Sequence, residues 1–206
     1  MNTLSLDYGA LLASLGRQSA PHDVAAVFAN AAAARYDAKQ DGACALLEFD
    51  QAGAKYWFDL AGSTDLPQAD RTVAAWALTP KDIHGRDSSY QRGFPMTPDE
   101  ESPVDRGHLI PHLSGGEFGP NIFRQDRALN RGWSEEGKRY RALERAAAGT
   151  LGALYFGHLL YCDDADHPRH IEIAVLLPGA ALRVEQFDNR PGQLSQSAGT
   201  EHPCGP

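Results

Sequence analysis

The sequence predicts an α+β protein in which an antiparallel β-sheet core is flanked by helices. Two observations indicate this class: short apolar runs of strand length are joined by polar turns, and helical segments are interspersed among them. The third observation is size, because 206 residues, 42% of them hydrophobic and 22% charged, are enough for one domain with a sizeable core.

Proline and glycine positions and the spacing of apolar residues predict the first helix and the first two strands. Pro21 is a typical start signal, and the apolar spacing after it predicts a helix over 23–38. Two strand-like runs, 43–49 and 54–60, are joined around Gly53 and predict a β-hairpin.

The middle of the chain changes character twice. The run 72–78 has strand length, and the polar connection 80–104 after it is long enough to indicate a functional loop. We expect a short returning strand at 121–123. The pattern then becomes helical, with a short helix over 126–131 and a longer one from Ser134, a good capping residue, to Gly149.

The last third of the chain returns to strands. The runs 153–161 and 170–177 are separated by the polar turn 163–168, and 182–187 is the last expected strand. The segment from Asn189 onward is rich in Pro, Gly, Ser and Gln, and we expect it to be a loose tail.

Charge excludes some classes of partner. The net charge of −8 disfavours non-specific nucleic-acid binding over the whole surface, but residues 124–145 hold seven basic and four acidic side chains. This segment is either a solvated helix face with internal ion pairs or a nucleic-acid contact. No apolar run approaches the ~20 residues of a membrane helix. The N-terminus lacks a basic start and carries Asp7 before a short apolar stretch, so it is a poor secretory signal.

One motif carries most of the functional information. The tetrapeptide DRGH at 105–108 is followed by a segment of the form N-x-x-x-Q-x-x-x-L-N at 121–130. These residues resemble the sugar-nonspecific DNA/RNA endonucleases of the ββα-metal (His-Me finger) type. The resemblance covers about 105–145, extends more weakly over 72–187, and does not reach 1–40.

The resemblance implies a ββα-metal finger active site that hydrolyses phosphodiester bonds. His108 is then the general base that takes a proton from water, a role that suits an imidazole. Asn130 is the metal ligand for one Mg²⁺ (or Mn²⁺) per site, since Mg²⁺ keeps several waters and needs few protein oxygens. Arg106 is suited to a bidentate contact with phosphate.

Two further catalytic roles follow from the same resemblance. Glu144 is expected to hold a metal-bound water, with Glu135 or Glu136 as alternatives, unless it only lies on a solvated helix face. The arginine that stabilises the phosphoryl group during the reaction is assigned to Arg92, with Arg86 in reserve.

Five residues are given binding or structural roles. Arg127, Arg131 and Asn121 are assigned to the substrate side, and Asn121 suits buttressing the loop better than touching the metal. Gly107 is expected to let the backbone turn tightly beside the base, and Asp105 to fix the geometry of that turn.

Two other patterns resemble cation sites. His112 lies four residues after His108, but Pro111 indicates an extended chain, so we interpret His112 as structural rather than as a second metal ligand. The acidic cluster 163–167 is more simply a polar hairpin turn than a cation site.

The expected function is therefore a metal-dependent, sequence-independent endonuclease acting on DNA, RNA or both. We expect a helical extension over 1–40 packed on the core, a nuclease domain over 41–188 and the loose tail over 189–206. Cys162 and Cys204 are able to pair if the protein is exported, although unpaired cysteines are the simpler expectation.

An unregulated nuclease harms its own cell. We therefore expect a role as an antibacterial toxin that is cytoplasmic in its producer or exported without a signal peptide, with an immunity protein as its partner and no membrane association. The alternative is a catalytically inactive nuclease-fold protein that binds nucleic acid or a protein partner.

Overall fold

The computed structural model describes residues 5–16, 19–61, 69–82 and 103–190. Six strands form one sheet in the order β1-β2-β3-β6-β7-β8, and every neighbouring pair is antiparallel. These strands are β1 (Leu46–Gln51), β2 (Ala54–Asp59), β3 (Arg71–Leu78), β6 (Leu154–Leu160), β7 (His170–Leu176) and β8 (Arg183–Asp188). This arrangement confirms the predicted α+β class with an antiparallel sheet.

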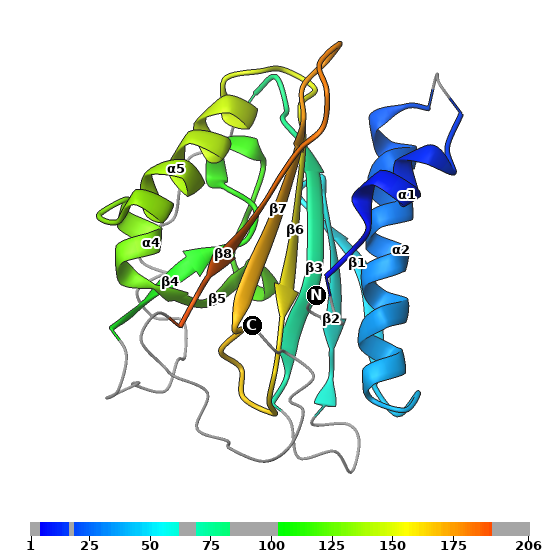
Figure 1. Ribbon diagram of the computed structural model, residues 1–206, viewed down its shortest axis with the longest axis vertical. Helices are drawn as coiled ribbons and strands as arrows, with labels where there is room; N and C mark the ends of the chain where they lie inside the picture. Colours follow the sequence, from blue (N-terminus) through cyan, green and yellow to red (C-terminus); the bar gives the residue numbers. More distant parts are fainter. Residues whose placement is uncertain (1–4, 17–18, 62–68, 83–102, 191–206) are drawn as a thin grey trace.

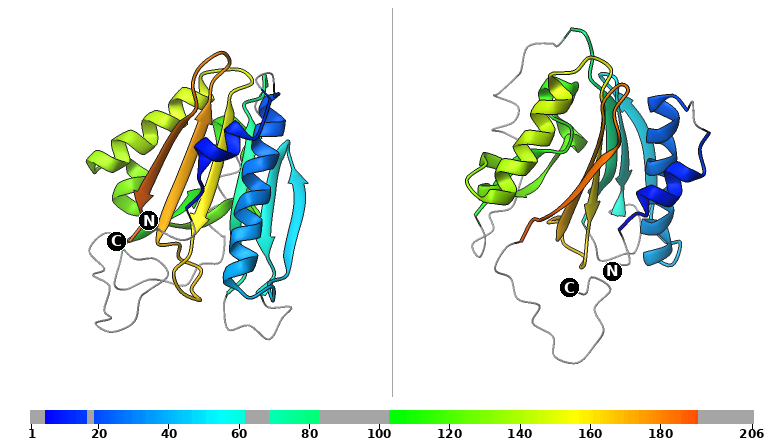
Figure 2. Two further views of the ribbon diagram at one scale, coloured as in Figure 1. Left: turned by 45° about the vertical axis from the view of Figure 1, so that its right-hand side comes forward. Right: turned by 45° about the horizontal axis from the view of Figure 1, so that its top comes forward.

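The sheet is covered on both faces, so the molecule has three layers (Figure 1, Figure 2). One face carries α1 (Tyr8–Ala13) and α2 (Pro21–Lys39), and the other carries the remaining elements. Those elements are the short helices η2 (His112–Ser114) and η3 (Gly119–Asn121), the helices α4 (Arg127–Arg131) and α5 (Glu135–Ala148), and the antiparallel pair β4 (Val104–His108) and β5 (Ile122–Asp126). The central strands β3 and β6 are therefore buried almost along their whole length, whereas β1 and β8 at the edges are partly exposed.

Helix α2 packs closely against β3 and β6 because its inner side consists largely of small residues. Ala25, Ala29 and Ala32 are fully buried there, and Phe28 inserts among them to meet Tyr8 edge-on, with ring centroids 4.9 Å apart. None of the described helices combines the length and the apolarity that crossing a lipid bilayer requires.

Helices α4 and α5 are set by their caps and by one close approach. The carboxylate of Asp126 accepts a hydrogen bond from the Leu129 amide (2.7 Å), and the hydroxyl of Ser134 accepts one from the Gly137 amide (2.9 Å). A Cβ atom on Gly137 would lie only 2.5 Å from the Ala128 carbonyl oxygen, so glycine is what allows α5 to start against α4.

Most elements lie where the sequence predicts them, with three differences. Helix α1 falls in a segment that shows little pattern, and β4 coincides with the DRGH motif, which the sequence suggests to be a turn. The third difference is the start of the loose tail, which was expected at Asn189, a residue that belongs to the packed fold. Asn189 is fully buried, donates to the carbonyl oxygens of Arg124 (2.8 Å) and Pro168 (3.0 Å), and accepts from the Asp126 amide (2.9 Å). The rest of that tail, 191–206, lies outside the described residues.

Candidate active site

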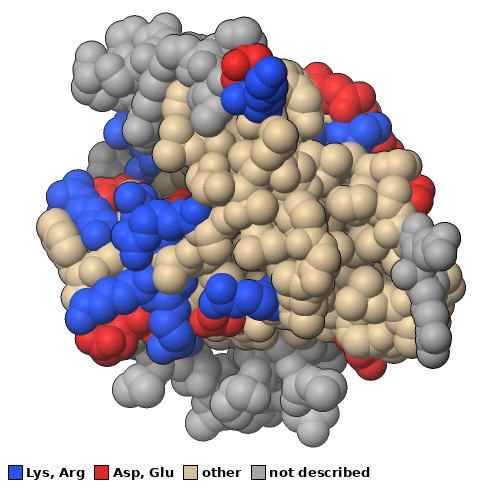
Figure 3. Space-filling view, turned by 90° about the horizontal axis from the view of Figure 1, so that it is seen from above, with Lys and Arg blue, Asp and Glu red and all other residues tan. Residues whose placement is uncertain are grey.

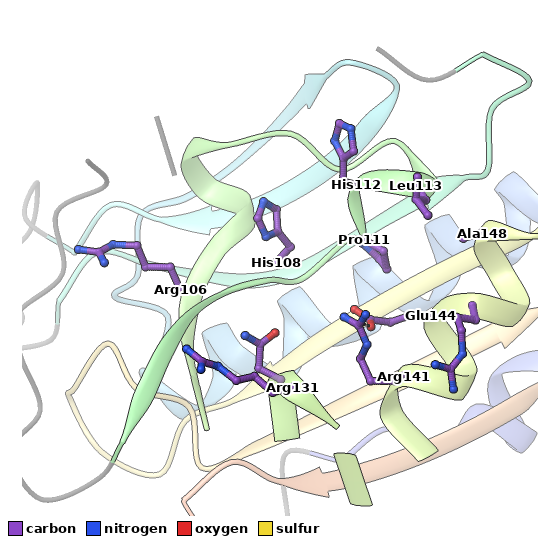
Figure 4. A pocket seen from close by; sticks show the side chains of 11 residues that line it. Arg106, His108, Pro111, His112, Leu113, Arg131, Arg141, Glu144 and Ala148 are labelled. Carbon is purple, nitrogen blue, oxygen red and sulfur yellow. Dashed lines mark ion pairs between the residues drawn. The ribbon is translucent and has the colours of Figure 1, made fainter. Parts of the chain in front are cut away.

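A recess of about 640 Å³ lies between the β4 segment, α4 and α5 (Figure 4). Its walls contain Arg106, His108, Pro111, His112, Leu113, Asn130, Arg131, Arg141, Glu144, Arg145 and Ala148. Four of the residues to which the sequence assigns catalytic or metal-binding roles are among them: His108, Asn130, Arg106 and Glu144. The fold therefore brings together groups that are up to 38 positions apart in the chain.

The pairing of β4 with β5 explains the glycine of the motif and corrects the expectation for it. Gly107 lies in an extended strand opposite Phe123 rather than in a tight turn. A Cβ atom at this position would lie 2.2 Å from the Oε1 atom of Gln125 and 2.6 Å from its Cβ. Glycine is needed here because the buried Gln125 side chain occupies the space that a larger residue at position 107 would need.

Asp105 joins β4 to α4 and is not a turn residue either. Its carboxylate accepts two bonds from Arg131 (2.6 and 3.0 Å), one from Arg127 (3.1 Å) and one from the Nδ2 of Asn130 (3.1 Å). Partial burial alone would raise the pKa of Asp105, but these hydrogen bonds outweigh burial and hold the pKa below its usual value. The residue thus stays ionised and anchors three side chains of α4.

The anchor also fixes the orientation of Asn130. An ionised carboxylate only accepts hydrogen bonds, so the amide of Asn130 must turn its NH₂ group toward Asp105 and its carbonyl oxygen away from it. A fixed amide oxygen in a roomy polar recess is a suitable single protein ligand for Mg²⁺ or Mn²⁺, which take oxygen donors and retain waters. Within the described residues no cluster of three His, Cys, Asp or Glu side chains offers a denser metal site.

Arg131 lines the recess and is held from two sides. Besides its bonds to Asp105, its guanidinium lies 4.9 Å from the ring centroid of Trp133, whose side chain is largely exposed. Arg127, the other arginine assigned to the substrate, also bonds to Asp105 but is not part of the recess wall.

One buried amide shapes the loop after β4. The side chain of Asn121 accepts a hydrogen bond from the Ile110 amide (2.7 Å) and donates to the carbonyl oxygens of Ile110 (2.9 Å) and Glu117 (2.7 Å). Because Asn121 is fully buried, it buttresses this loop, and the assignment to the substrate side is wrong for this residue.

His112, which the sequence suggests to be structural, lines the same recess as His108. Pro111 is extended, as expected, with φ −56° and ψ 142°, and His112 begins the one-turn helix η2 directly after it. Figure 4 shows both imidazole rings projecting to the same side of this segment. In the sequence, the signal for this arrangement is the four-residue spacing of His108 and His112, which there suggests only a candidate metal site.

Helix α5 supplies the opposite wall through Arg141, Glu144, Arg145 and Ala148, whose spacing places them on one helix face. Glu144 is only 14% exposed, and burial raises its pKa to about 7, although Arg141 and Arg145 pull in the opposite direction. Arg141 lies 3.3 Å from the Glu144 carboxylate.

The two alternatives to Glu144 lie outside the recess wall. Glu135 pairs with Lys138 at 2.5 Å, and Glu136 lies 3.8 Å from Arg139.

The same helix explains the uneven charge of the chain, since Lys and Arg side chains gather on the α4–α5 side of the molecule (Figure 3). Arg92 and Arg86, proposed for the phosphoryl group, lie outside the described residues.

The acidic cluster 163–167 forms the polar connection between β6 and β7, as its interpretation as a hairpin turn predicts. Two of its three carboxylates are paired with arginines: Asp163 with Arg190 (2.6 Å) and Asp166 with Arg124 (2.6 Å). Cys44 is a free thiol, whereas Cys162 is disulfide-bonded, which corrects the simpler expectation for Cys162. Cys204 lies outside the described residues.

No protein-family model matches the chain, and no curated protein matches its sequence.

Proposed function

We propose that the chain is a metal-dependent nuclease that hydrolyses phosphodiester bonds of DNA, RNA or both. The observation that carries this proposal is that His108, Asn130 and Glu144 line one recess together with several arginines. The order of β4, β5 and α4 around the recess, a hairpin followed by a helix, is the element order of a ββα-metal finger and supports the same proposal.

A divalent cation fits the proposal at Asn130. The amide oxygen that is turned away from Asp105 would hold the ion, with water completing its ligands. When bound, Mg²⁺ or Mn²⁺ would supply Lewis-acid chemistry and charge neutralisation at the phosphate and the leaving oxygen.

The side chains of the recess supply the rest. The imidazole of His108 accepts the proton of the attacking water. Arg106 and Arg131 bind phosphate oxygens through guanidinium groups, which match the phosphate geometry. Contacts of this kind address the sugar–phosphate backbone and not the bases, so we expect cutting without sequence preference.

Plasmid DNA and a structured RNA, each incubated with Mg²⁺ or Mn²⁺ and with EDTA, test the proposal. We expect cleavage by the wild type only with the metal, and a rate at least ~100-fold lower for His108→Ala. His22→Ala is the matched control, because His22 is exposed at the start of α2 on the other face of the sheet, and it should cleave like the wild type.

Two results would oppose the proposal. Intact polymer under all metals and pH values, with retained nucleic-acid binding, would favour the catalytically inactive binding protein instead. Equal cleavage by His108→Ala and by the wild type would remove His108 as the base.

As a nuclease the chain would be toxic to the cell that makes it, and we propose a role as an antibacterial toxin that an immunity protein restrains. Induced expression in a bacterium measures this directly. We expect the wild type to reduce viable counts and His108→Ala to be tolerated; equal toxicity of both would oppose the role.

A further inference from the structure

We propose that His112 is a second catalytic residue, the general acid that protonates the leaving oxygen when the phosphodiester is cut. This inference rests on the proposed nuclease function and adds a role that the DRGH motif does not contain. It starts from the finding that a second imidazole, four residues after His108, lines the same recess.

The surroundings of His112 differ from those of a structural histidine. Buried histidines of this chain have partners: His158 contacts Glu172 at 3.1 Å, and His167 lies 3.2 Å from the Asn189 carbonyl oxygen. Among the described residues, the ring of His112 has neither a hydrogen-bond nor an ion-pair partner. The part of the chain that the structure describes therefore leaves both ring nitrogens unengaged.

The backbone nevertheless holds His112 firmly. The Asn121 side chain bonds both polar backbone atoms of Ile110, two residues earlier. The carbonyl oxygen of Pro111 accepts from the amides of Ser114 (2.8 Å) and Gly116 (3.1 Å), and Gly115 closes the turn with φ 96°, a left-handed conformation that suits glycine. These backbone hydrogen bonds fix the point of the recess wall from which the His112 side chain starts.

A proton donor at the leaving oxygen makes the ester bond easier to break. Water attacks phosphorus, and His108 takes the proton that the water loses. The bond between phosphorus and the leaving oxygen breaks, and its electron pair stays on that oxygen, which receives a proton from His112. The products are a phosphomonoester and an alcohol, and the two imidazoles exchange their protons with solvent before the next cycle.

The arginines around the pair fit this division of labour. Arg106, Arg131 and Arg141 neutralise the phosphate, but a guanidinium does not give up its proton in proteins. Two side chains of this wall can hold and release a proton near neutral pH, His112 and Glu144, whose pKa is raised by burial. Glu144 is paired with Arg141 (3.3 Å), whereas His112 has no ion-pair partner among the described residues, so His112 is the better-suited donor.

The leaving group tests the proposal. In bis(p-nitrophenyl) phosphate either ester bond releases p-nitrophenolate, which needs no proton to leave, whereas thymidylyl-thymidine releases an alkoxide. For His112→Ala and His112→Gln we expect kcat to fall at least ~100-fold on thymidylyl-thymidine and at most about threefold on bis(p-nitrophenyl) phosphate. His108→Ala should lose activity on both substrates.

His22→Ala is the matched control, because His22 is an exposed histidine at the start of α2, on the other face of the sheet. We expect it to cleave both substrates at wild-type rates. Equal losses of the His112 variants on both substrates would overturn the proposal in favour of a binding or structural role, and so would unchanged rates on both. A wild type that leaves plasmid DNA, RNA and both of these diesters intact would remove the proposed function itself, and this inference with it.

Discussion

The two faces of the six-stranded sheet each carry histidine and glutamate side chains, but in opposite surroundings. On the α2 face, Glu172 is almost fully buried and bonds to His158 (3.1 Å), to the Tyr8 hydroxyl (3.0 Å) and to the hydroxyl of Ser5. On the α5 face, Glu144 and His112 line an open recess.

The pKa values of the two glutamates express this difference. Burial would raise the pKa of Glu172, but hydrogen bonds from His158, Ser5 and Tyr8 outweigh it and lower the pKa. Burial raises the pKa of Glu144 to about 7 because Arg141 and Arg145 compensate only in part. A buried titratable group whose hydrogen bonds are all made stabilises the fold. A group in a recess whose burial is not fully offset by neighbouring charges is available for chemistry.

The largest effect is expected from disrupting the hydrogen-bond network of Glu172 on the α2 face. Glu172→Ala leaves His158 and Tyr8 buried without their partner and releases the contact to the segment before α1. Removing one member of a buried pair costs about 3–5 kcal/mol, which urea denaturation at pH 7 will measure. Glu48→Ala, at an exposed ion pair with Lys55 on the edge strand β1, is the control and should lose less than about 1 kcal/mol. A loss no larger than that of the control would show that the network contributes little.

A smaller, pH-dependent effect is expected on the recess face. Since the pKa of Glu144 is higher in the folded chain than its ordinary value of 4.5, the folded chain binds more protons between pH 4.5 and about 7. The stability that Glu144 contributes is therefore lost as pH rises through this window, by about 3 kcal/mol at most. Glu144→Gln should remove this slope, as measured by urea denaturation at pH 4.5, 6 and 7.5.

Glu136→Gln is the control for this measurement, because Glu136 lies on the same helix but is more exposed, and it should keep the wild-type slope. Glu172 should act with the opposite sign, because a lowered pKa gives stability that is lost as pH falls below the usual range of a carboxyl group. Identical slopes in wild type and Glu144→Gln would contradict the comparison between the faces.

The smallest effect is expected at the cap of α5. Ser134→Ala removes the hydrogen bond to the Gly137 amide and should cost about 1 kcal/mol in urea denaturation. Ser14→Ala, where the hydroxyl only donates to the Leu11 carbonyl on an exposed helix end, should change stability by less than about 0.5 kcal/mol. If both variants lose the same amount, the cap does not contribute beyond an ordinary surface contact.

The fold was predictable where local signals mark the elements. Pro21 and Ser134 identify the starts of α2 and α5, and short apolar runs bounded by polar turns identify the sheet strands. Strand β4 was not, because its polar residues have no strand pattern of their own and its conformation depends on pairing with β5, 14 to 22 positions away. Helix α1 has six residues, and its position depends on the packing of Tyr8 against Phe28.

The candidate site was predictable as a set of residues but not in its supporting contacts. The motif indicates His108, Asn130 and Arg106, and all three line the recess. Glycine is needed at position 107 because the Gln125 side chain lies so close to it, and the position of His112 depends on the conformation of the turn from Pro111 to Gly115. Both are three-dimensional facts that spacing along the chain does not contain.

The carboxamide of Asn121 has a consequence for strand register. Beyond the pair of His108 with Ile122, the Leu109 amide donates to the backbone carbonyl oxygen of Asn121 (2.9 Å), and the Asn121 side chain adds a further rung by bonding both polar backbone atoms of Ile110. A slip of one residue would break this rung and would drive the next residue of β4 against Gln125 in place of Gly107. A slip of one residue also turns side chains to the opposite face of a strand. The Asn121 hydrogen bonds and the close contact of position 107 with Gln125 therefore keep Arg106 and His108 on the recess side together.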